Sequence, residues 1–496
     1  MAALCCSVAP TASRPGTTTC LRRAVGKLDA LPRRFDRQLA RRGIRGKIAD
    51  PAHASLFQLD AELAESSAIA TGRFRQMPRF LACLRIGLAA AALVLLSDVR
   101  SSSAAPEESN LGKAEGYPVA PALSRSREER YRVGSFSALD TLGPSCSLAP
   151  ASIPLPLPTA TPVNFNYSFR GTAFTLDDYM TRQRATAVLA LHDGQIVAER
   201  YNYDRTPAMR MLSNSMAKTI TALGLVKALE DGLIGSFDDR AAKYVPELDG
   251  TLYGGTKIVS LMRMASGARY VEDYTPTDDR AKYNWITQKK GNIAAAKSVM
   301  DRADPEGTQF NYAGAQTQVL GLVLRAATHR TICDYLDEKI WQPIGAQAKA
   351  SWMLNAADKM EIAQGDFNAT VRDYARLGLM LANDGMVSGR QVVSAKSLLD
   401  MTDASRQPPA FRPGIMRWHD STYYGYGFQV WLLPGSHRRF VLQGVYGQAL
   451  YVDPELKLVM VHTAVGKDAS GDASGTHLGA ERDALFRGIV AHYGRW

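Results

Sequence analysis

Ser215-Met216-Ala217-Lys218 is a Ser-x-x-Lys tetrad at the start of a segment with helical periodicity. Apolar residues recur there every three or four positions, which predicts one face of an amphipathic helix: Met216, Ile220, Leu223, Val226, Leu229 and Leu233. Gly232 marks the expected end of this helix. Because positions i and i+3 share a helical face, we expect the Ser215 hydroxyl and the Lys218 amine to lie within reach of each other.

This placement predicts acyl-transfer chemistry. A serine is a poor nucleophile until a base removes its proton. Lys218 can be that base if burial and nearby positive potential lower its pKa. The start of a helix also offers free backbone N–H groups that can face a developing oxyanion. Ser-x-x-Lys tetrads occur by chance as well, so the rest of the chain has to support this interpretation.

A second motif centres on Tyr312. The stretch from Pro305 to Gly314 predicts a turn that delivers this tyrosine ahead of a helix over residues 317–327. A phenol beside a lysine cation can have its pKa lowered and can pass a proton to a leaving group. The alternative is a surface turn with a packed tyrosine.

A third motif runs from Leu442 to Gln448 and contains Gly444 and Gly447. Glycines in a strand allow a substrate to approach the backbone closely. The Val445 N–H is expected to pair with the Ser215 N–H as an oxyanion hole. The alternative is a bend between two strands.

The order of predicted elements indicates an α+β fold. An Asp193-Gly194 turn joins two strand-like runs, residues 187–191 and 195–201, and predicts a hairpin. Residues 240–400 are predicted to be mostly helical. Later segments predict four strands and a terminal helix: Tyr426–Leu432, Phe440–Leu442, Ala449–Val452, Leu458–Thr463 and Gly479–Tyr493. We therefore expect an antiparallel sheet flanked by helices and built from both ends of the chain, with a helical insertion over about 240–400.

Taken together, the motifs resemble the serine β-lactamase and penicillin-binding-protein superfamily. Within it the chain is most similar to the class C and esterase branch, and to the 6-aminohexanoate-dimer hydrolases in particular. The resemblance covers about residues 185–490 and rests on five stretches: Ser215–Lys218, Tyr244–Leu248, Tyr270–Tyr274, Phe310–Tyr312 and Tyr446–Gln448.

The resemblance implies a role for each matching residue. Ser215 corresponds to the nucleophile, Lys218 to its base and Tyr312 to the proton relay. Tyr274 matches a tyrosine that contacts the substrate amide, and Asp279 matches a substrate amine site across an alignment gap. The third motif adds Gly444, Tyr446 and Gln448 as substrate-binding residues.

Two departures from the family pattern bear on the substrate. The tyrosine motif is Tyr312-Ala313-Gly314, where the family has Asn or Ser at its third position. The third motif begins with Leu442, where the family has Lys or His, so no cation is offered to the carboxylate of a β-lactam. These departures favour esters or amides without that carboxylate.

The net charge of +11 belongs mostly to the first 105 residues, which carry +9, so the remainder is nearly neutral and does not predict a nucleic-acid binder. Residues 77–105 have a basic start, an apolar run over residues 86–96 and the small residues Ser102-Ser103-Ala104. This order predicts a signal peptide or a signal anchor. We expect residues 1–76 to be disordered or a spurious extension, 106–165 to be a Pro/Ser-rich linker or arm, and 166–496 to be the hydrolase domain.

Only two of the six cysteines, Cys146 and Cys333, follow residue 105, so one disulfide is possible in an oxidising compartment. The sequence contains no Walker loop and no zinc-protease motif, and we expect no metal or cofactor.

The predicted protein is a periplasmic or secreted serine hydrolase that acts on a small ester or amide, with a membrane contact only through a signal anchor. The alternatives are a β-lactamase or D-alanyl-D-alanine peptidase, and a cell-wall binding or sensing module without turnover.

Overall fold

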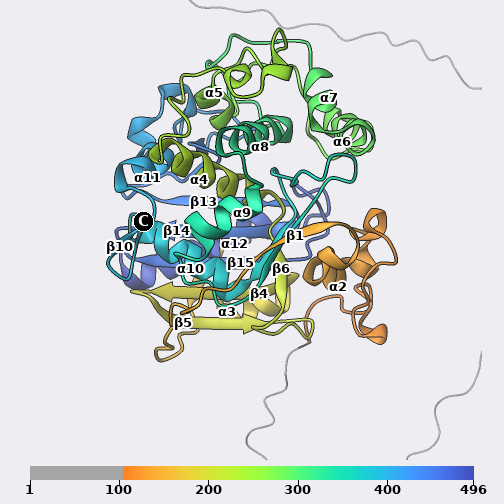
Figure 1. Ribbon diagram of the computed structural model, residues 1–496. Helices are drawn as coiled ribbons and strands as arrows, with labels where there is room; N and C mark the ends of the chain where they lie inside the picture. The colour runs from red at the N-terminus through yellow and green to blue at the C-terminus, as the bar shows by residue number, and fades with distance from the viewer. Residues whose placement is uncertain (1–103) are drawn as a thin grey trace, which may run out of the picture. The chain divides into compact units, whose positions relative to one another are not determined.

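The computed structural model describes residues 104–496, and its centre is a seven-stranded antiparallel sheet (Figure 1). In sheet order the strands are β11 (Gly425–Tyr426), β12 (Trp431–Leu432), β13 (Phe440–Gly444), β14 (Gln448–Asp453), β15 (Leu458–Ala464), β4 (Ala185–His192) and β5 (Gln195–Tyr201). The predicted hairpin of β4 and β5 therefore pairs with the C-terminal strands through β15. The predicted α+β fold with a sheet built from both ends of the chain is confirmed.

Both faces of this sheet are covered, because the central strands carry apolar side chains on both faces. In β15, Val459 and Val461 pack into one core cluster, whereas Met460 packs into the other. The first face is covered by α10 (Val371–Ala382), which contacts β15, β14 and β4. Gly378 allows this close approach, since a Cβ there would lie 2.5 Å from Val459. The second face is covered by α12 (Leu478–Tyr493) and α3 (Leu176–Arg182).

A helical layer continues the first core away from the sheet. Its helices are α4 (Ala217–Glu230), α5 (Ile258–Met262), α6 (Asp279–Lys290), α7 (Asn292–Lys297), α8 (Gly314–Thr328) and α9 (Ile332–Leu336). Figure 1 shows α5, α6, α7 and α8 on the far side of α4 from the sheet. Helix α4 is buried along nearly its whole length and packs against α8 and α9. Within residues 104–496 no helix combines the length and the apolar character needed to cross a bilayer.

The expected helical insertion over 240–400 is only partly right. Two of its segments are strands, β7 (Ala350–Met353) and β8 (Phe367–Thr370), and α10 belongs to the layer that covers the main sheet. The strands join β1 (Ser145–Leu148) and β6 (Arg210–Leu212) in a second antiparallel sheet, in the order β1-β7-β8-β6. Both strands are only four residues long, too short a run for period-two alternation to single out, and their polar residues Ser351, Asn368 and Thr370 are buried together with the apolar ones.

The prediction of one strand over Tyr426–Leu432 is also wrong, because β11 and β12 are two short strands joined by a turn. Gly427 fits there because a Cβ would lie 1.9 Å from the carbonyl oxygen of Met401. Gln429 has φ +57°, and its buried amide donates to the carbonyl oxygens of Leu261 and Met262. These tertiary hydrogen bonds hold the turn.

Two alternatives were expected for residues 106–165, a linker or an arm; the free linker is wrong, because the first part of this stretch packs on the body. Residues 104–148 form what we call the N-terminal arm: several 3-10 turns, helix α2 (Arg132–Ser137) and strand β1. Val133 and Phe136 of the arm form a small core with Leu212 and Val465 of the body. The expected signal segment and upstream extension lie outside the described residues, except for the last two positions of the signal segment.

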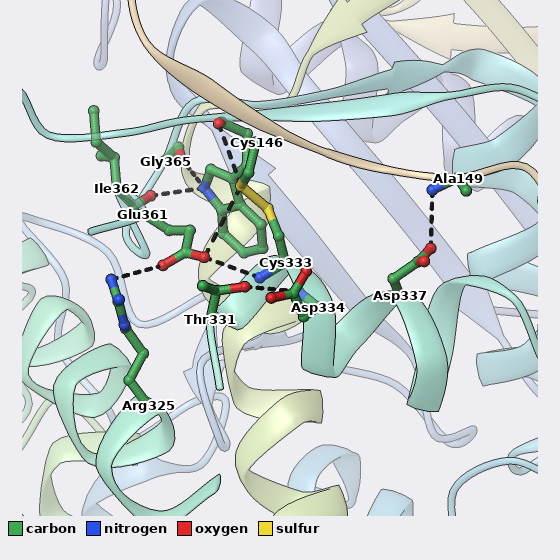
Figure 2. Close-up of a disulfide and its surroundings, with 11 residues drawn as sticks. Cys146, Ala149, Arg325, Thr331, Cys333, Asp334, Asp337, Glu361, Ile362 and Gly365 are labelled. Atoms are coloured by element: carbon green, nitrogen blue, oxygen red, sulfur yellow. Dashed lines mark hydrogen bonds and ion pairs between the residues drawn. A yellow bond between two sulfur atoms is a disulfide. The ribbon is translucent and has the colours of Figure 1, made fainter. Parts of the chain in front are cut away.

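A disulfide between Cys146 and Cys333 joins β1 of the arm to α9 (Figure 2). The carboxylate of Glu361 lies beside it, accepts the Cys333 N–H at 3.0 Å and faces Arg325 at 3.4 Å. This pairing, which the sequence left open, closes a loop of 187 residues in the covalent chain.

Candidate active site

Ser215 lies at the junction between the second sheet and helix α4. Strand β6 ends at Leu212, a 3-10 turn covers Asn214–Met216, and α4 follows. The predicted helix start is therefore confirmed. Asn214 has φ +44°, an unfavourable conformation for a residue with a side chain. Such strain persists only where the surroundings enforce it, and it is common next to reacting groups.

Lys218 lies one turn further on and is 2% exposed. Its Nζ donates to the Ser215 Oγ at 3.0 Å and to the carbonyl oxygen of Gln364 at 2.7 Å. Burial lowers the pKa of Lys218 to about 8, against the opposing effect of Glu272 and Asp366. A substantial fraction of this amine is therefore neutral near pH 8 and able to accept a proton from Ser215.

Tyr312 closes the other side of this pair. The Lys218 Nζ lies 5.2 Å from the centre of its ring, which is within cation–π range. Burial and the Glu272 carboxylate raise the pKa of Tyr312, while the Ser215 hydroxyl opposes that rise. The expectation of a lowered pKa is therefore wrong, because desolvation and the Glu272 charge both raise the pKa of Tyr312. Tyr312 remains a neutral phenol that can donate a proton.

The glycine of the Tyr312-Ala313-Gly314 motif is explained by its neighbours. A Cβ at Gly314 would lie 1.7 Å from the Gln364 Oε1, so the Gln364 side chain occupies the space that Asn or Ser would fill. The Gly314 N–H donates to the Glu272 Oε2 at 2.6 Å. The polar side chains of Gln364 and Glu272, from two other segments, therefore lie where the family has an Asn or Ser side chain.

Ser215 opens into a cavity of about 270 Å³ that Tyr312, Tyr274, Gly444 and Val445 also line. Gly444, the last residue of β13, packs against the Ser215 turn, where a Cβ would lie 2.3 Å from the Ser213 carbonyl oxygen. The side-chain amide of Asn214 donates to the Val445 carbonyl oxygen at 3.0 Å. These contacts fix the third motif against the turn that carries Ser215, as an oxyanion hole shared by the two segments requires.

The cavity has an aromatic wall and a cationic wall. Trp418 and Trp431 lie with their ring centres 5.6 and 5.7 Å from that of Tyr312. Arg482 of α12 also lines the cavity and donates to the Gln443 Oε1 at 2.9 Å. The cationic wall is continued by Lys467, which pairs with Glu107 of the N-terminal arm.

Three of the predicted substrate-binding residues do not line the cavity. The ring of Tyr446 turns toward the arm, 5.7 Å from Phe136. Gln448 is buried and donates to the Ala464 carbonyl oxygen at 2.7 Å, so it supports the strand pair. Asp279 accepts the Val271 N–H at 3.0 Å and stabilises the turn before α6.

Four residues of the site were not predicted from the sequence: Glu272, Gln364, Asp366 and Arg482. Glu272 lies in the Tyr270–Tyr274 stretch that resembles the family, but its role was not predicted: it accepts from the Tyr274 hydroxyl at 3.2 Å and affects the pKa of both Lys218 and Tyr312. Each of the four comes from a segment distant from Ser215 in sequence. The sequence held one sign of them: Gly314 replaces the Asn or Ser of the family, which indicates that a polar side chain from another segment lies there.

Two groups of side chains in residues 104–496 are close enough to share a metal ion, and neither lines the cavity. The first is Cys146, Cys333 and Glu361, in which the sulfurs are bonded to each other. The second is His437, Asp453 and Glu455, in which the Arg439 guanidinium already pairs with Asp453. Neither group is a suitable metal site in this form.

The chain is similar to known proteins in sequence and in fold. The family model described as Beta-lactamase matches residues 175–482. A 6-aminohexanoate-dimer hydrolase from Paenarthrobacter ureafaciens is 26% identical over 365 residues, which cover 71% of this chain and 88% of that protein. The solved structure titled "Putative 6-aminohexanoate-dimer hydrolase from Bacillus anthracis" aligns with a TM-score of 0.65 at 22% identity, over 73% of this chain and 96% of that one.

Proposed function

Because the chain belongs to the beta-lactamase family of serine hydrolases, we propose that it cleaves an ester or amide bond through an acyl-enzyme on Ser215. The observation that carries this proposal is the contact between Lys218 and Ser215, 3.0 Å long and at the edge of a cavity. The lowered pKa of Lys218 supports its role as the base.

The reaction proceeds in two stages. Neutral Lys218 takes the proton of Ser215 as its Oγ attacks the substrate carbonyl carbon, and the negative charge on the carbonyl oxygen faces the N–H groups of Ser215 and Val445. Tyr312 gives its proton to the leaving alcohol or amine and regains one from Lys218, so the leaving group departs neutral. Water then attacks the carbonyl carbon of the acyl-enzyme and gives a proton to Lys218. Lys218 passes this proton to the Ser215 Oγ as the ester bond to Ser215 breaks and the carboxylic acid leaves.

The proposed substrates are short linear amides and esters. The similarity to a 6-aminohexanoate-dimer hydrolase supports this choice. The aromatic wall of Trp418 and Trp431 supports an apolar segment next to the scissile bond. Tyr274, which lines the cavity, is proposed to contact the amide.

Substitution of the reacting pair tests the mechanism. We expect Ser215→Ala to abolish ester turnover and fluorophosphonate labelling, and Lys218→Ala to lower kcat/KM by roughly 10³-fold, because the two act as a unit. Ser168→Ala, which changes an exposed serine on β2 (Asn166–Phe169), is the matched control. Intact mass and kinetics on a panel of short acyl esters and linear amides are the measurements. Turnover retained by Ser215→Ala would exclude this mechanism.

We also propose that the protein is exported and processed near Ala105. The basic, apolar and small-residue order of residues 77–105 supports this proposal, as does the disulfide between Cys146 and Cys333, because such bonds persist in oxidising compartments. N-terminal sequencing of the protein from the producing cells is expected to begin near residue 105. A cytosolic protein that retains Met1 would contradict the proposal.

A further inference from the structure

The N-terminal arm places the Arg127 guanidinium beside two segments that hold the active-site residues. Arg127 lies between two 3-10 turns of the arm, and its guanidinium pairs with the Asp366 carboxylate at 2.8 Å. A weaker contact of the same nitrogen reaches the Asn214 Oδ1 at 3.4 Å. Asn214 is the strained residue before Ser215, and Asp366 follows the Gln364-Gly365 segment whose carbonyl oxygen binds Lys218. One side chain therefore contacts both segments that hold the catalytic pair.

Asp366 also acts on Lys218 through its charge. The charged groups that face the Lys218 amine are Glu272, which precedes α6, Asp366, which precedes β8, and Arg280 of α6. The two carboxylates favour the ammonium form, and Arg280 disfavours it. The remaining neighbour is the Tyr312 ring, whose hydroxyl stays protonated. A guanidinium bound to Asp366 offsets one of the two negative charges.

We propose, on the basis of the function above, that Arg127 is a positioning residue of this active site. Through its contacts with Asp366 and Asn214 it fixes the Ser215 turn and keeps Lys218 available as a base. The arm, which precedes the residues that the family model matches, is thus a part of the catalytic apparatus.

Independent contacts hold the arm in the place that this role requires. The Arg132 guanidinium lies 4.4 Å from the centre of the Tyr446 ring, and its NH2 and Nε donate to the Arg127 carbonyl oxygen. Tyr446 belongs to the same third motif as Val445, so the arm contacts the proposed oxyanion segment as well. Removal of the Arg127 side chain is therefore expected to leave the arm docked.

The test is the pH dependence of Ser215 acylation, measured as the rate of fluorophosphonate labelling from pH 6 to pH 10. In the wild-type protein this rate is expected to rise through the pKa of Lys218, about 8. Arg127→Met leaves Asp366 uncompensated, which stabilises the ammonium form, so the rise is expected to move up by about 0.5 pH unit. Asp366→Asn removes the negative charge and is expected to move the rise to lower pH.

The double variant Arg127→Met/Asp366→Asn makes the test specific. Without the carboxylate, loss of Arg127 is expected to shift the profile much less than it does in the wild-type background. Arg127→Lys, which keeps the charge, is expected to restore most of the profile. Arg125→Ala is the matched control, because Arg125 lies two positions away and contacts exposed Glu128 and the Tyr131 ring, both within the arm.

Three outcomes distinguish the possibilities. Opposite shifts for the two single variants, with a small shift from Arg127→Met in the Asp366→Asn background, support the proposal. An Arg127→Met protein that melts at a lower temperature but keeps the wild-type pH profile overturns it, since a merely structural residue behaves that way. If Ser215→Ala is still labelled at the active site, the proposed function fails instead, so the two failures are distinguishable.

Discussion

At the scale of single residues, burial and the Glu272 carboxylate act on the protonation states of both Lys218 and Tyr312. Glu272 acts on both: it raises the pKa of Lys218 and contributes to the raised pKa of Tyr312. It also binds the Gly314 N–H, so it keeps the tyrosine motif in place. Its charge therefore works against the neutral lysine that the reaction needs, while its hydrogen bond orders the site.

The variant Glu272→Gln separates these two effects. Glutamine keeps an acceptor for the Gly314 N–H but removes the charge that favours the Lys218 ammonium. The pKa of Lys218 is then expected to fall, and the rise of kcat/KM with pH is expected to begin at lower pH than in the wild-type protein. The measurement is a kcat/KM profile from pH 6 to pH 10, with Glu128→Gln in the exposed arm as the control. A shift to higher pH would show that the hydrogen bond, and not the charge, dominates.

At the scale of elements, the cavity is lined by residues of β13, of α12 and of the loop before α8. Strand β13 supplies Gln443 and Gly444, and helix α12 supplies Arg482, which is 4% exposed. Leu442, on which the expectation against a bound carboxylate rested, is buried in the core and does not line the cavity. The structure adds two cations to the cavity wall, yet both have partners: Arg482 lies 3.6 Å from Asp483, and Lys467 pairs with Glu107.

These partners determine the expected substrate preference. A carboxylate that enters the cavity must lose its hydration and compete with Asp483 and Glu107 for the cations, at a cost of several kcal/mol when no free positive partner is present. Neutral short-chain esters are therefore expected to exceed nitrocefin in kcat/KM by about 10²-fold or more. Side-by-side kinetics on the two substrates measure this ratio. Faster turnover of nitrocefin would move the β-lactamase alternative to first place.

At the scale of the whole molecule, the arm and the body are joined by packing, by ion pairs and by one covalent bond. The packing is the small core of Val133, Phe136 and their neighbours, and the covalent bond is the Cys146–Cys333 disulfide. A cross-link over 187 residues removes much of the conformational freedom of the unfolded chain.

Loss of this disulfide is expected to lower stability more than activity. Replacement of both cysteines by serine is expected to cost about 3 kcal/mol in the free energy of unfolding and to lower the Tm. Ester turnover at 25 °C is expected to persist in the folded fraction, because the packing core and the Arg127 pair remain. Urea unfolding of the variant and of the wild-type protein, with and without dithiothreitol, measures the difference. Equal midpoints in all samples would contradict this expectation.

The features that depend on neighbours in the chain could be predicted from the sequence alone. Ser215 and Lys218 are three positions apart on one helix, so their contact follows from helical geometry alone. The β4–β5 hairpin follows from an Asp-Gly turn between apolar runs, and the order of the motifs was sufficient for the family and the fold class.

The side chains that surround Ser215 and Lys218 come from distant segments, and their positions depend on how those segments pack. Arg127 and Asp366 are 239 positions apart, and they meet only because β8 pairs with β6 and the arm packs beside that sheet. For the same reason Tyr446 turns to the arm, and Gln364 fills the space above Gly314. The pKa of Tyr312 likewise depends on burial and on Glu272, which are properties of the assembled core. A local sequence pattern does not predict such packing, because the free energy that favours this packing comes from contacts between segments far apart in the chain.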